Sequence, residues 1–305
     1  MSSRVIQKGT DVIPYLAGIY PQIYLIPQEG GNPLYREIVL AGKDAPSHSL
    51  DHFQKDPGDL LTMEETPAGD IMAVTLISRS DFETMSQIMG HKCRNDRIPA
   101  TEGASILDGV ISWQKIRAHE ASFRAEEAAK GNTDPDWDSE FKAFTSSKRN
   151  YTDALILLSS GPYSAITHEQ AGFSETDWKK YSMIIRKTHE CTHFICRRLF
   201  PEWIDPLWDE LTADAVGIHA ALGRYDQTLA ELFLGIRDSR YVGGRLENYI
   251  RKEEEKTPEA LDHTAARIHE VLNRFSAWIS SETFRDPWDL AVRLEKKYPE
   301  WWKTI

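Results

Sequence analysis

Apolar residues recur with two different spacings along the chain, and the spacing changes after about residue 100. In the first part, short apolar runs are separated by turn signals, which is typical of strands and loops. Residues 71–77 are apolar enough to predict a buried strand, and residues 81–89 predict a short helix. Residues 23–26 and 37–40, on either side of a Gly-Gly-Asn-Pro turn, favour a hairpin with a long loop.

From residue 101 onward the spacing becomes helical. We predict one helix over residues 101–130 and a second that opens at Asp134-Pro135-Asp136 and runs to Phe144. The apolar run over residues 154–158 fits a buried helix and a buried strand equally well. Further helices are predicted over residues 226–236, 245–252 and 257–279 and from Asp286-Pro287 to the end, with the acidic run 253–255 as a solvated helix end.

The strongest helical signal starts at residue 174. Ser174 is the predicted N-cap, Asp177 is its capping-box partner, and Pro201 ends the helix. The residues that recur at helical spacing and form the apolar stripe are Tyr181, Ile184, Ile185, Ile195 and Leu199.

A second helix follows at once. Asp205-Pro206 supplies its N-cap and first-turn proline, and Gly223 supplies the cap at its other end. Gly217 lies within this helix, and a residue without Cβ lets two helices approach closely. We therefore expect two close, antiparallel helices.

The first of these helices carries the motif His189-Glu190-x-x-His193. Residues four apart lie on the same face of a helix, so the two imidazoles can bind one metal ion from one side. Glu190 points toward the same cleft, where it can activate a water molecule. This pattern is typical of zinc peptidases, and we expect Zn²⁺ at the two histidines.

The second helix carries Glu210 and Asp214, again four residues apart. A catalytic zinc site needs a third protein ligand, and a carboxylate commonly holds a ligand imidazole by its other nitrogen. We assign Glu210 as the third ligand and Asp214 as the orienting carboxylate. Asp209, adjacent to Glu210, is the alternative third ligand.

Together the two motifs resemble those of the gluzincins, the thermolysin-like class of zinc metallopeptidases, over about residues 174–223. The resemblance implies zinc ligands on both helices, a general base and acid in the first motif, and an orienting carboxylate behind the ligands. The implied zinc ligands are His189, His193 and Glu210. Glu190 is the implied general base and acid, and Asp214 is the implied orienting carboxylate.

The resemblance also implies a peptide or protein substrate, bound along an edge strand upstream of the metal helix. Residues 155–166 are the candidate for that strand, and an ordinary core helix is the alternative.

The same class uses a downstream His or Tyr to stabilise the oxyanion of the reaction. Tyr241 and Arg245, beside Gly243-Gly244, are candidates, as are His263 and His269 on the helix predicted from residue 257. Tyr241 and His263 are taken first. For each candidate, an ordinary turn, surface or core position is the alternative.

Other histidines fit a metal site less well. His219 lies two and a half turns beyond Glu210 and therefore points to the opposite side of its helix. His91-Lys92-Cys93 could form a second metal cluster, but no partner pair follows at ligand spacing, so a polar loop is favoured.

Composition narrows the class of protein. The 305 residues are 41% hydrophobic and 27% charged, with a formal net charge of −11, which is typical of a globular protein and argues against nucleic acid or an anionic membrane as a partner. We expect no signal peptide and no membrane-spanning segment, and three cysteines are too few for a disulfide framework. A cytoplasmic protein with reduced cysteines is therefore predicted.

These patterns predict an α+β protein with a small sheet-containing part over residues 1–100 and a mostly helical, zincin-like part over residues 101–305. The predicted function is a zinc-dependent metallopeptidase. The alternative is a non-catalytic, zinc-stabilised scaffold or binding module, in which a fourth side chain such as His91 or Cys93 would close the zinc site.

Overall fold

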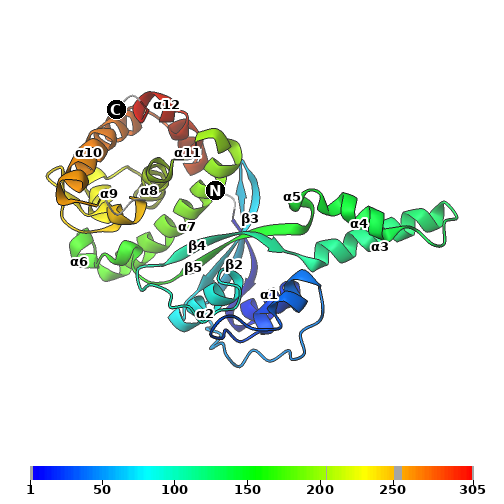
Figure 1. The fold of residues 1–305 in the computed structure, drawn as a ribbon. Helices are drawn as coiled ribbons and strands as arrows, with labels where there is room; N and C mark the ends of the chain where they lie inside the picture. The colour runs from blue at the N-terminus through cyan, green and yellow to red at the C-terminus, as the bar shows by residue number, and fades with distance from the viewer. Residues whose placement is uncertain (1–2, 204, 251–255, 304–305) are drawn as a thin grey trace.

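The computed structural model describes residues 3–203, 205–250 and 256–303, and its mixture of helices with one main sheet confirms the predicted α+β class. Figure 1 shows the sheet at the centre, a helical part on one side and a long helical arm on the other. Among the described residues, the sheet has five strands in the order β1-β2-β3-β5-β4. β3 and β5 are parallel, and the other neighbours are antiparallel. The strands are β1 Ser3–Lys8, β2 Leu60–Thr66, β3 Gly69–Leu76, β4 Ala104–Ile111 and β5 Thr152–Ser159.

The sheet draws strands from both sides of the boundary predicted at residue 100. β3 confirms the strand predicted over residues 71–77, and β5 shows that the ambiguous run at 154–158 is a strand. The sheet-containing part therefore extends to the end of β5, and the mostly helical part follows it.

β4 corrects the helix predicted over residues 101–130. Only the second half is helical, where α3 spans Trp113–Ala129. In the first half, Ile106 and Val110 are four residues apart and so also fit a helical stripe. Gly109 has a φ of 77° and lies where the register with β5 shifts, so a bulge breaks the alternation that would have marked a strand.

Each face of the sheet has its own apolar core. Leu157 packs into the core on one face, and its neighbour Ile156 packs into the core on the other, as the alternation along a strand requires. The N-terminal helices cover the first face, and helices from the C-terminal part cover the second (Figure 1). The covering helices are α1 Val12–Ile19 and α2 Arg79–Met89 on the first face, and α7 Glu175–Leu199 and α11 Pro287–Glu295 on the second.

The hairpin predicted from residues 23–26 and 37–40 is wrong. The first run begins in a 3-10 helix, η2 Pro21–Tyr24, and the second lies in a short π-helix, η3 Arg36–Leu40. Ile23 is fully buried in the same core as α1. This run is therefore apolar because it packs in the core, and not because it pairs as a strand.

The helical part follows its predicted caps. The Ser174 hydroxyl accepts a hydrogen bond from the Asp177 amide at the start of α7, and Asp205 and Gly223 cap the two ends of α8. The helices predicted over 226–236 and 257–279 are confirmed as α9 and α10, although α9 ends at Leu234 and Ile236 lies in a strand. The helix predicted from Asp286 to the end is confirmed only in its first part, because α11 ends at Glu295 and a separate short helix follows. The remaining helices here are α6 His168–Ala171, α8 Pro206–Leu222, α9 Gln227–Leu234, α10 Pro258–Ser281 and α12 Tyr298–Trp301.

Shorter elements connect these helices. Over the residues predicted as a helix at 245–252, the structure has a 3-10 helix that ends at Tyr249, and the backbone of Ile250 is extended. Residues 251–252 and the whole predicted acidic run 253–255 lie outside the described residues. The short elements are η1 Gly9–Asp11, η4 Tyr163–Ala165, η5 Pro201–Trp203, β6 Ile236–Arg237, β7 Arg240–Tyr241 and η6 Arg245–Tyr249.

The arm consists of α3, α4 Trp137–Thr145 and α5 Lys148–Tyr151, and it projects away from the sheet (Figure 1). Asp136 caps α4, which confirms the helix predicted at that position. Ile111 and Thr152, at the two ends of the arm, are register partners in the β4–β5 ladder. The arm is therefore the connection between two adjacent antiparallel strands.

Two predicted absences can be compared with the structure. None of the helices in the described part of the chain is long and apolar enough to cross a membrane. Cys93, Cys191 and Cys196 are all free and buried, which confirms that the chain has no disulfide framework.

Candidate metal centre

α7 places His189 and His193 one turn apart and directs both rings toward α8. Their side chains are buried, with exposed fractions of 4% and 3%. The two Nε2 atoms are 2.9 Å apart, and the ring planes are nearly perpendicular, at 88°. Two ring nitrogens this close must share a proton or a metal ion, because two facing lone pairs would repel each other.

Glu210, on α8, completes a triangle with the two rings. Its Oε2 lies 3.4 Å from Nε2 of His189, and its Oε1 lies 3.3 Å from Nε2 of His193. A tetrahedral zinc ion with bonds of about 2.0–2.1 Å holds its ligand atoms about 3.3 Å apart. The three side chains therefore fit such an ion, and within the described residues they are the group of His, Cys, Asp or Glu with that geometry.

Gly217 allows α7 and α8 to lie this close together. A Cβ at this position would lie 2.9 Å from the carbonyl oxygen of Ile185, one turn before His189 on α7. The close approach predicted from Gly217 is confirmed. Any larger residue would push the helices apart beside the histidines.

The second nitrogen of each ring faces a carboxylate from α8. Nδ1 of His189 lies 2.9 Å from Oδ1 of Asp214, and Nδ1 of His193 lies 2.8 Å from Oδ2 of Asp209. Carboxylates in this position fix the ring orientation and make the ligating nitrogen more basic. The structure thus places Asp214 where the sequence predicts an orienting carboxylate, and it places Asp209 behind the other histidine.

Asp214 is held in turn by two residues from connecting segments. The Tyr163 hydroxyl, in η4, donates to Oδ1 of Asp214 at 2.6 Å, and Arg245, in η6, donates to Oδ2. Arg245 also donates from Nη1 to the Tyr163 hydroxyl at 3.2 Å. Both carboxylate oxygens are therefore satisfied, and the orienting group has little freedom to rotate.

Tyr249, also in η6, contacts the third ligand directly. Its hydroxyl donates to Oε2 of Glu210 at 2.8 Å, and its side chain lines the cavity beside the histidines. Sequence analysis missed Tyr163 and Tyr249 and assigned Arg245 only as an oxyanion candidate. All three residues lie in short 3-10 segments, where no periodic spacing exists to mark them.

The ionisable groups of the centre stabilise one another. Burial favours neutral imidazole, yet Asp209 and Glu210 raise the pKa of His193 well above its ordinary value. Burial opposes charge on Glu210 as well, but His193 and His189 hold its pKa well below its ordinary value. The folded chain therefore keeps carboxylates ionised around a shared positive charge, which is the environment that a divalent cation requires.

A cavity of about 600 Å³ opens beside the centre, between α7 and β4. Glu190 lines it together with both histidines, and its carboxylate has no hydrogen-bond or ion-pair partner among the described residues. Residues 103–106, at the start of β4, form another part of the wall. A carboxylate in this position can act on a molecule bound between the two elements.

The strand beside this cavity is not the one that the sequence predicts. Residues 155–159 of the predicted substrate-binding segment belong to β5, which pairs with β3 on one side and β4 on the other, so that prediction is wrong. The edge strand beside this cavity is β4 instead, and β1 forms the other edge of the sheet. Strand order, unlike strand identity, does not follow from local apolar spacing.

The structure does not bring the two predicted oxyanion residues to the cavity. The Tyr241 hydroxyl bonds to the backbone of Gly244, and His263 is exposed on α10 and does not line the cavity. His269, the other histidine candidate, lies 2.7 Å from Glu231.

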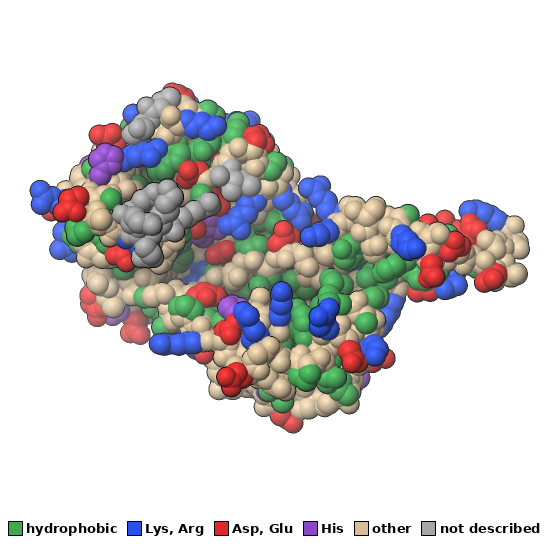
Figure 2. Space-filling model, in the orientation of Figure 1, with side chains coloured by type: hydrophobic (Ala, Val, Ile, Leu, Met, Phe, Trp, Pro, Cys, Tyr) green, Lys and Arg blue, Asp and Glu red, His purple; other side chains and the backbone are tan. Residues whose placement is uncertain are grey.

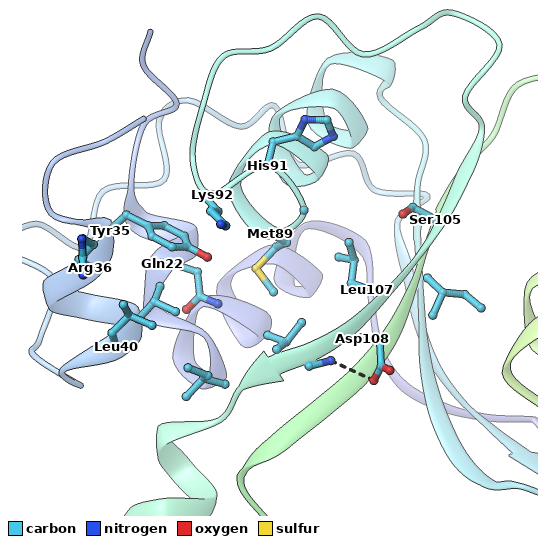
Figure 3. A pocket seen from close by; sticks show the side chains of 16 residues that line it. Gln22, Tyr35, Arg36, Leu40, Met89, His91, Lys92, Ser105, Leu107 and Asp108 are labelled. Atoms are coloured by element: carbon cyan, nitrogen blue, oxygen red, sulfur yellow. Dashed lines mark hydrogen bonds between the residues drawn. The ribbon is translucent and has the colours of Figure 1, made fainter. Parts of the chain in front are cut away.

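A larger cavity, of about 790 Å³, lies against the N-terminal core side of β4. Figure 3 shows Tyr35 and Lys92 directed into it, while His91 is turned away. Nδ1 of His91 lies 3.3 Å from Asp96, and Cys93 is buried among apolar residues of the N-terminal core. Among the described residues, positions 91–93 join no group of side chains with metal-binding geometry.

Comparison with known families gives one result. A family model matches residues 26–290, which is most of the chain. The chain belongs to DUF7005, a family of unknown function. No curated protein and no solved structure matches it.

The DUF7005 match starts before β2 and ends within α11. It therefore includes β4, α7 and α8, and with them every residue of the candidate metal centre. Membership of DUF7005 leaves the activity open, so the geometry of the centre has to carry any functional assignment.

Proposed function

We propose that this DUF7005 chain is a zinc-dependent metallopeptidase of the gluzincin type. The observation that carries the proposal is the convergence of His189, His193 and Glu210 from two closely packed helices. Three protein ligands are typical of catalytic zinc sites, whereas structural sites use four. Zinc bound there would supply Lewis-acid polarisation of a carbonyl and a lowered pKa for water.

Glu190 is the proposed general base and acid. It adjoins His189 in the sequence, lines the same cavity, and has no partner among the described residues that would compete for its carboxylate. Such a carboxylate can take a proton from the attacking water and return it to the leaving amine. Asp214 and Asp209 hold the histidine rings and take no part in this transfer.

β4 is the proposed binding surface for the substrate main chain. An edge strand leaves N–H and C=O groups unpaired on its outer side, and an extended peptide can add to it as a further strand. Residues 103–106 line the cavity that contains Glu190. We therefore propose a peptide or protein substrate, bound in extended form and recognised largely through its backbone.

Tyr249 replaces Tyr241 and His263 as the proposed oxyanion donor. Its hydroxyl is already within 2.8 Å of a proposed zinc ligand, Glu210, and its side chain lines the cavity. A donor that reaches the negative charge developing on a carbonyl oxygen typically contributes about 10²–10³-fold to the rate.

The first experiment compares wild type with Glu190→Gln. We expect about one zinc ion per chain in both proteins by elemental analysis, and a loss of at least roughly 10²-fold in cleavage of unstructured peptides by the variant. Glutamine keeps the size of the side chain but cannot accept the proton. The matched control is Glu202→Gln, an exposed position in η5, which should cleave as wild type does.

Two outcomes would contradict the proposal. If the Glu190→Gln protein cleaves peptides as fast as wild type does, Glu190 is not the general base. If wild type takes up no zinc from zinc-supplemented buffer, the three residues do not form a zinc site.

A zinc-stabilised scaffold remains the second candidate. It needs a fourth side chain to close the site, but Cys93 packs in the core on the other face of the sheet, and His91 pairs with Asp96. Zinc binding without cleavage of any peptide would favour the scaffold.

The proposal places the protein in the cytoplasm, without nucleic-acid or membrane partners. The three buried, free cysteines are compatible with a reducing compartment, and the net charge of −11 would repel nucleic acid and anionic lipid.

A further inference from the structure

A third cavity, of about 630 Å³, lies next to the cavity that opens beside the candidate metal centre. Arg197, one turn beyond His193 on α7, lines both of these cavities. β4 also contributes to both, through Ile106 in the cavity beside the centre and Asp108 in the third cavity. These two residues are about 7 Å apart along a strand and lie on the same face of it. A strand added to β4 would therefore pass from one cavity to the other.

Cations predominate in the walls of this third cavity, here called the basic cavity. The chain as a whole carries a net charge of −11, so this local excess opposes the overall balance. Figure 2 shows Lys and Arg side chains gathered between the helical part and the base of the arm. The cationic residues are Lys115, Lys148, Arg149, Arg197 and Arg198, and the acidic residues are Asp70, Asp108 and Asp153.

Two of these cations already have carboxylate partners. Nζ of Lys115 lies 2.5 Å from Asp153, and Nη2 of Arg197 lies 3.3 Å from Asp209. Since Asp209 also faces His193, Arg197 links the basic cavity electrostatically to the candidate metal centre.

The other three cations have no carboxylate partner among the described residues. Arg198 lies over the ring of Phe194 at 4.2 Å and donates to a backbone carbonyl. Lys148 and Arg149 are exposed at the start of α5, with no ion pair to a described residue. Positive charges in a cavity wall, without internal neutralisation, attract anionic groups.

We propose that the basic cavity binds acidic side chains of the polypeptide that the candidate centre cleaves, a few residues from the scissile bond. This inference rests on the proposed function. Guanidinium groups pair with carboxylates in a bidentate manner, and the edge of β4 offers backbone pairing that only a polypeptide can return. Nucleic acid lacks that backbone and would be repelled by the rest of the chain.

Binding can be measured apart from cleavage by using zinc-loaded Glu190→Gln protein. Two fluorescein-labelled peptides have the same length and sequence, except that one carries a short block of Glu residues (the Glu peptide) where the other carries Gln (the Gln peptide). Fluorescence anisotropy should give a dissociation constant about tenfold lower for the Glu peptide at low salt. The preference should largely disappear at about 1 M salt, where the screening length is about 3 Å.

The decisive variant replaces both unpaired cations of the arm, as Lys148→Gln with Arg149→Gln. It should weaken binding of the Glu peptide roughly fivefold and leave the Gln peptide unchanged, since exposed ion pairs each contribute only modestly to binding. The matched control, Arg124→Gln with Lys142→Gln, removes two exposed charges from the same arm outside the cavity and should change neither constant. Equal weakening by both double variants, or no preference for the Glu peptide, would overturn the proposal.

Cleavage by wild type separates this inference from the function beneath it. If wild type cleaves both peptides with equal kcat/KM, the basic cavity does not select acidic substrates, but the proposed peptidase activity is supported. If binding shows a Glu preference that depends on Lys148 and Arg149 while neither peptide is cleaved, the proposed binding role of the cavity is supported and the proposed peptidase activity is contradicted.

Discussion

Neighbouring helices bring His and Glu together both in the arm and between α7 and α8, yet among the described residues only α7 and α8 form a candidate metal centre. In the arm, Nε2 of His119 lies 2.7 Å from Oε1 of Glu140, and both side chains are 31% exposed. Between α7 and α8, His189 and His193 lie farther from Glu210, at 3.4 and 3.3 Å, but no side chain of the three is more than 16% exposed. The shorter contact therefore belongs to the pair without the centre.

The difference lies in the number of donors and in what holds them. In the arm a single ring faces a single carboxylate, and that ring stacks on Phe144 at 4.0 Å. Between α7 and α8 a second imidazole stands one turn away, and Asp214 and Asp209 fix both rings from behind. Convergence of three donors with fixed orientation distinguishes a metal centre from an ion pair.

The largest expected effect concerns dependence on metal. His189→Ala should abolish zinc binding, because one of three ligands is lost, whereas His119→Ala should keep it. With free zinc near 1,000 times its dissociation constant, stripping the metal with EDTA should cost wild type about 4 kcal/mol. Thermal unfolding with and without EDTA measures this cost. If EDTA destabilises the His189→Ala protein as much as wild type, the metal binds at another site, and the comparison of α7 and α8 with the arm fails.

The next effect concerns the distance between α7 and α8. Gly217→Ala should destabilise the fold by about 1–3 kcal/mol and weaken zinc binding, because its Cβ would lie 2.9 Å from the carbonyl oxygen of Ile185. The matched control is Gly18→Ala in α1, where a Cβ would have no other atom within 4 Å. Alanine there should stabilise the fold by about 0.5–1 kcal/mol. Urea unfolding of both variants gives the comparison, and equal effects would show that the helix contact is not tight.

A smaller effect concerns pH. Burial, with Asp209 nearby, raises the pKa of Glu295 from 4.5 to about 7. Between these values the unfolded chain loses this proton while the folded chain keeps it, so stability falls as pH rises through that window. Glu295→Gln removes the penalty, and its stability relative to wild type should rise by about 2 kcal/mol between pH 5 and pH 8.

Urea unfolding in EDTA at the two pH values tests this expectation without metal. The matched change in the arm, Glu140→Gln, affects a side chain that is 31% exposed and should shift stability by less than about 1 kcal/mol at either pH. If Glu295→Gln changes stability equally at pH 5 and pH 8, the buried carboxyl is ionised throughout.

The features that the sequence predicted well are local. Ser174, Asp205 and Gly223 mark helix ends because capping depends on residues three or four positions apart. The same short range places His189 over His193 and fixes Gly217 at the helix contact. Helical periodicity alone therefore brought the candidate ligands onto facing helices.

The features that the sequence did not predict depend on distant contacts or on irregular backbone. β4 was taken for a helix because Gly109 interrupts its alternation, and its place at the edge follows from pairing with β5 across the whole arm. Tyr163 reaches Asp214 from a segment 51 residues away, and Tyr249 reaches Glu210 across 39 residues. No spacing rule covers such separations.

The register of Ile111 opposite Thr152 makes the arm an insertion in what is otherwise a β-hairpin. A tight turn could close the same two strands, so the arm can be lost or exchanged without disturbing the histidine-bearing helices. Lys115, Lys148 and Arg149 would leave with it. Under the proposed function, the metal ligands and the cations of the arm therefore lie in separate stretches of the chain, while Arg197 and Arg198 of the basic cavity stay on α7.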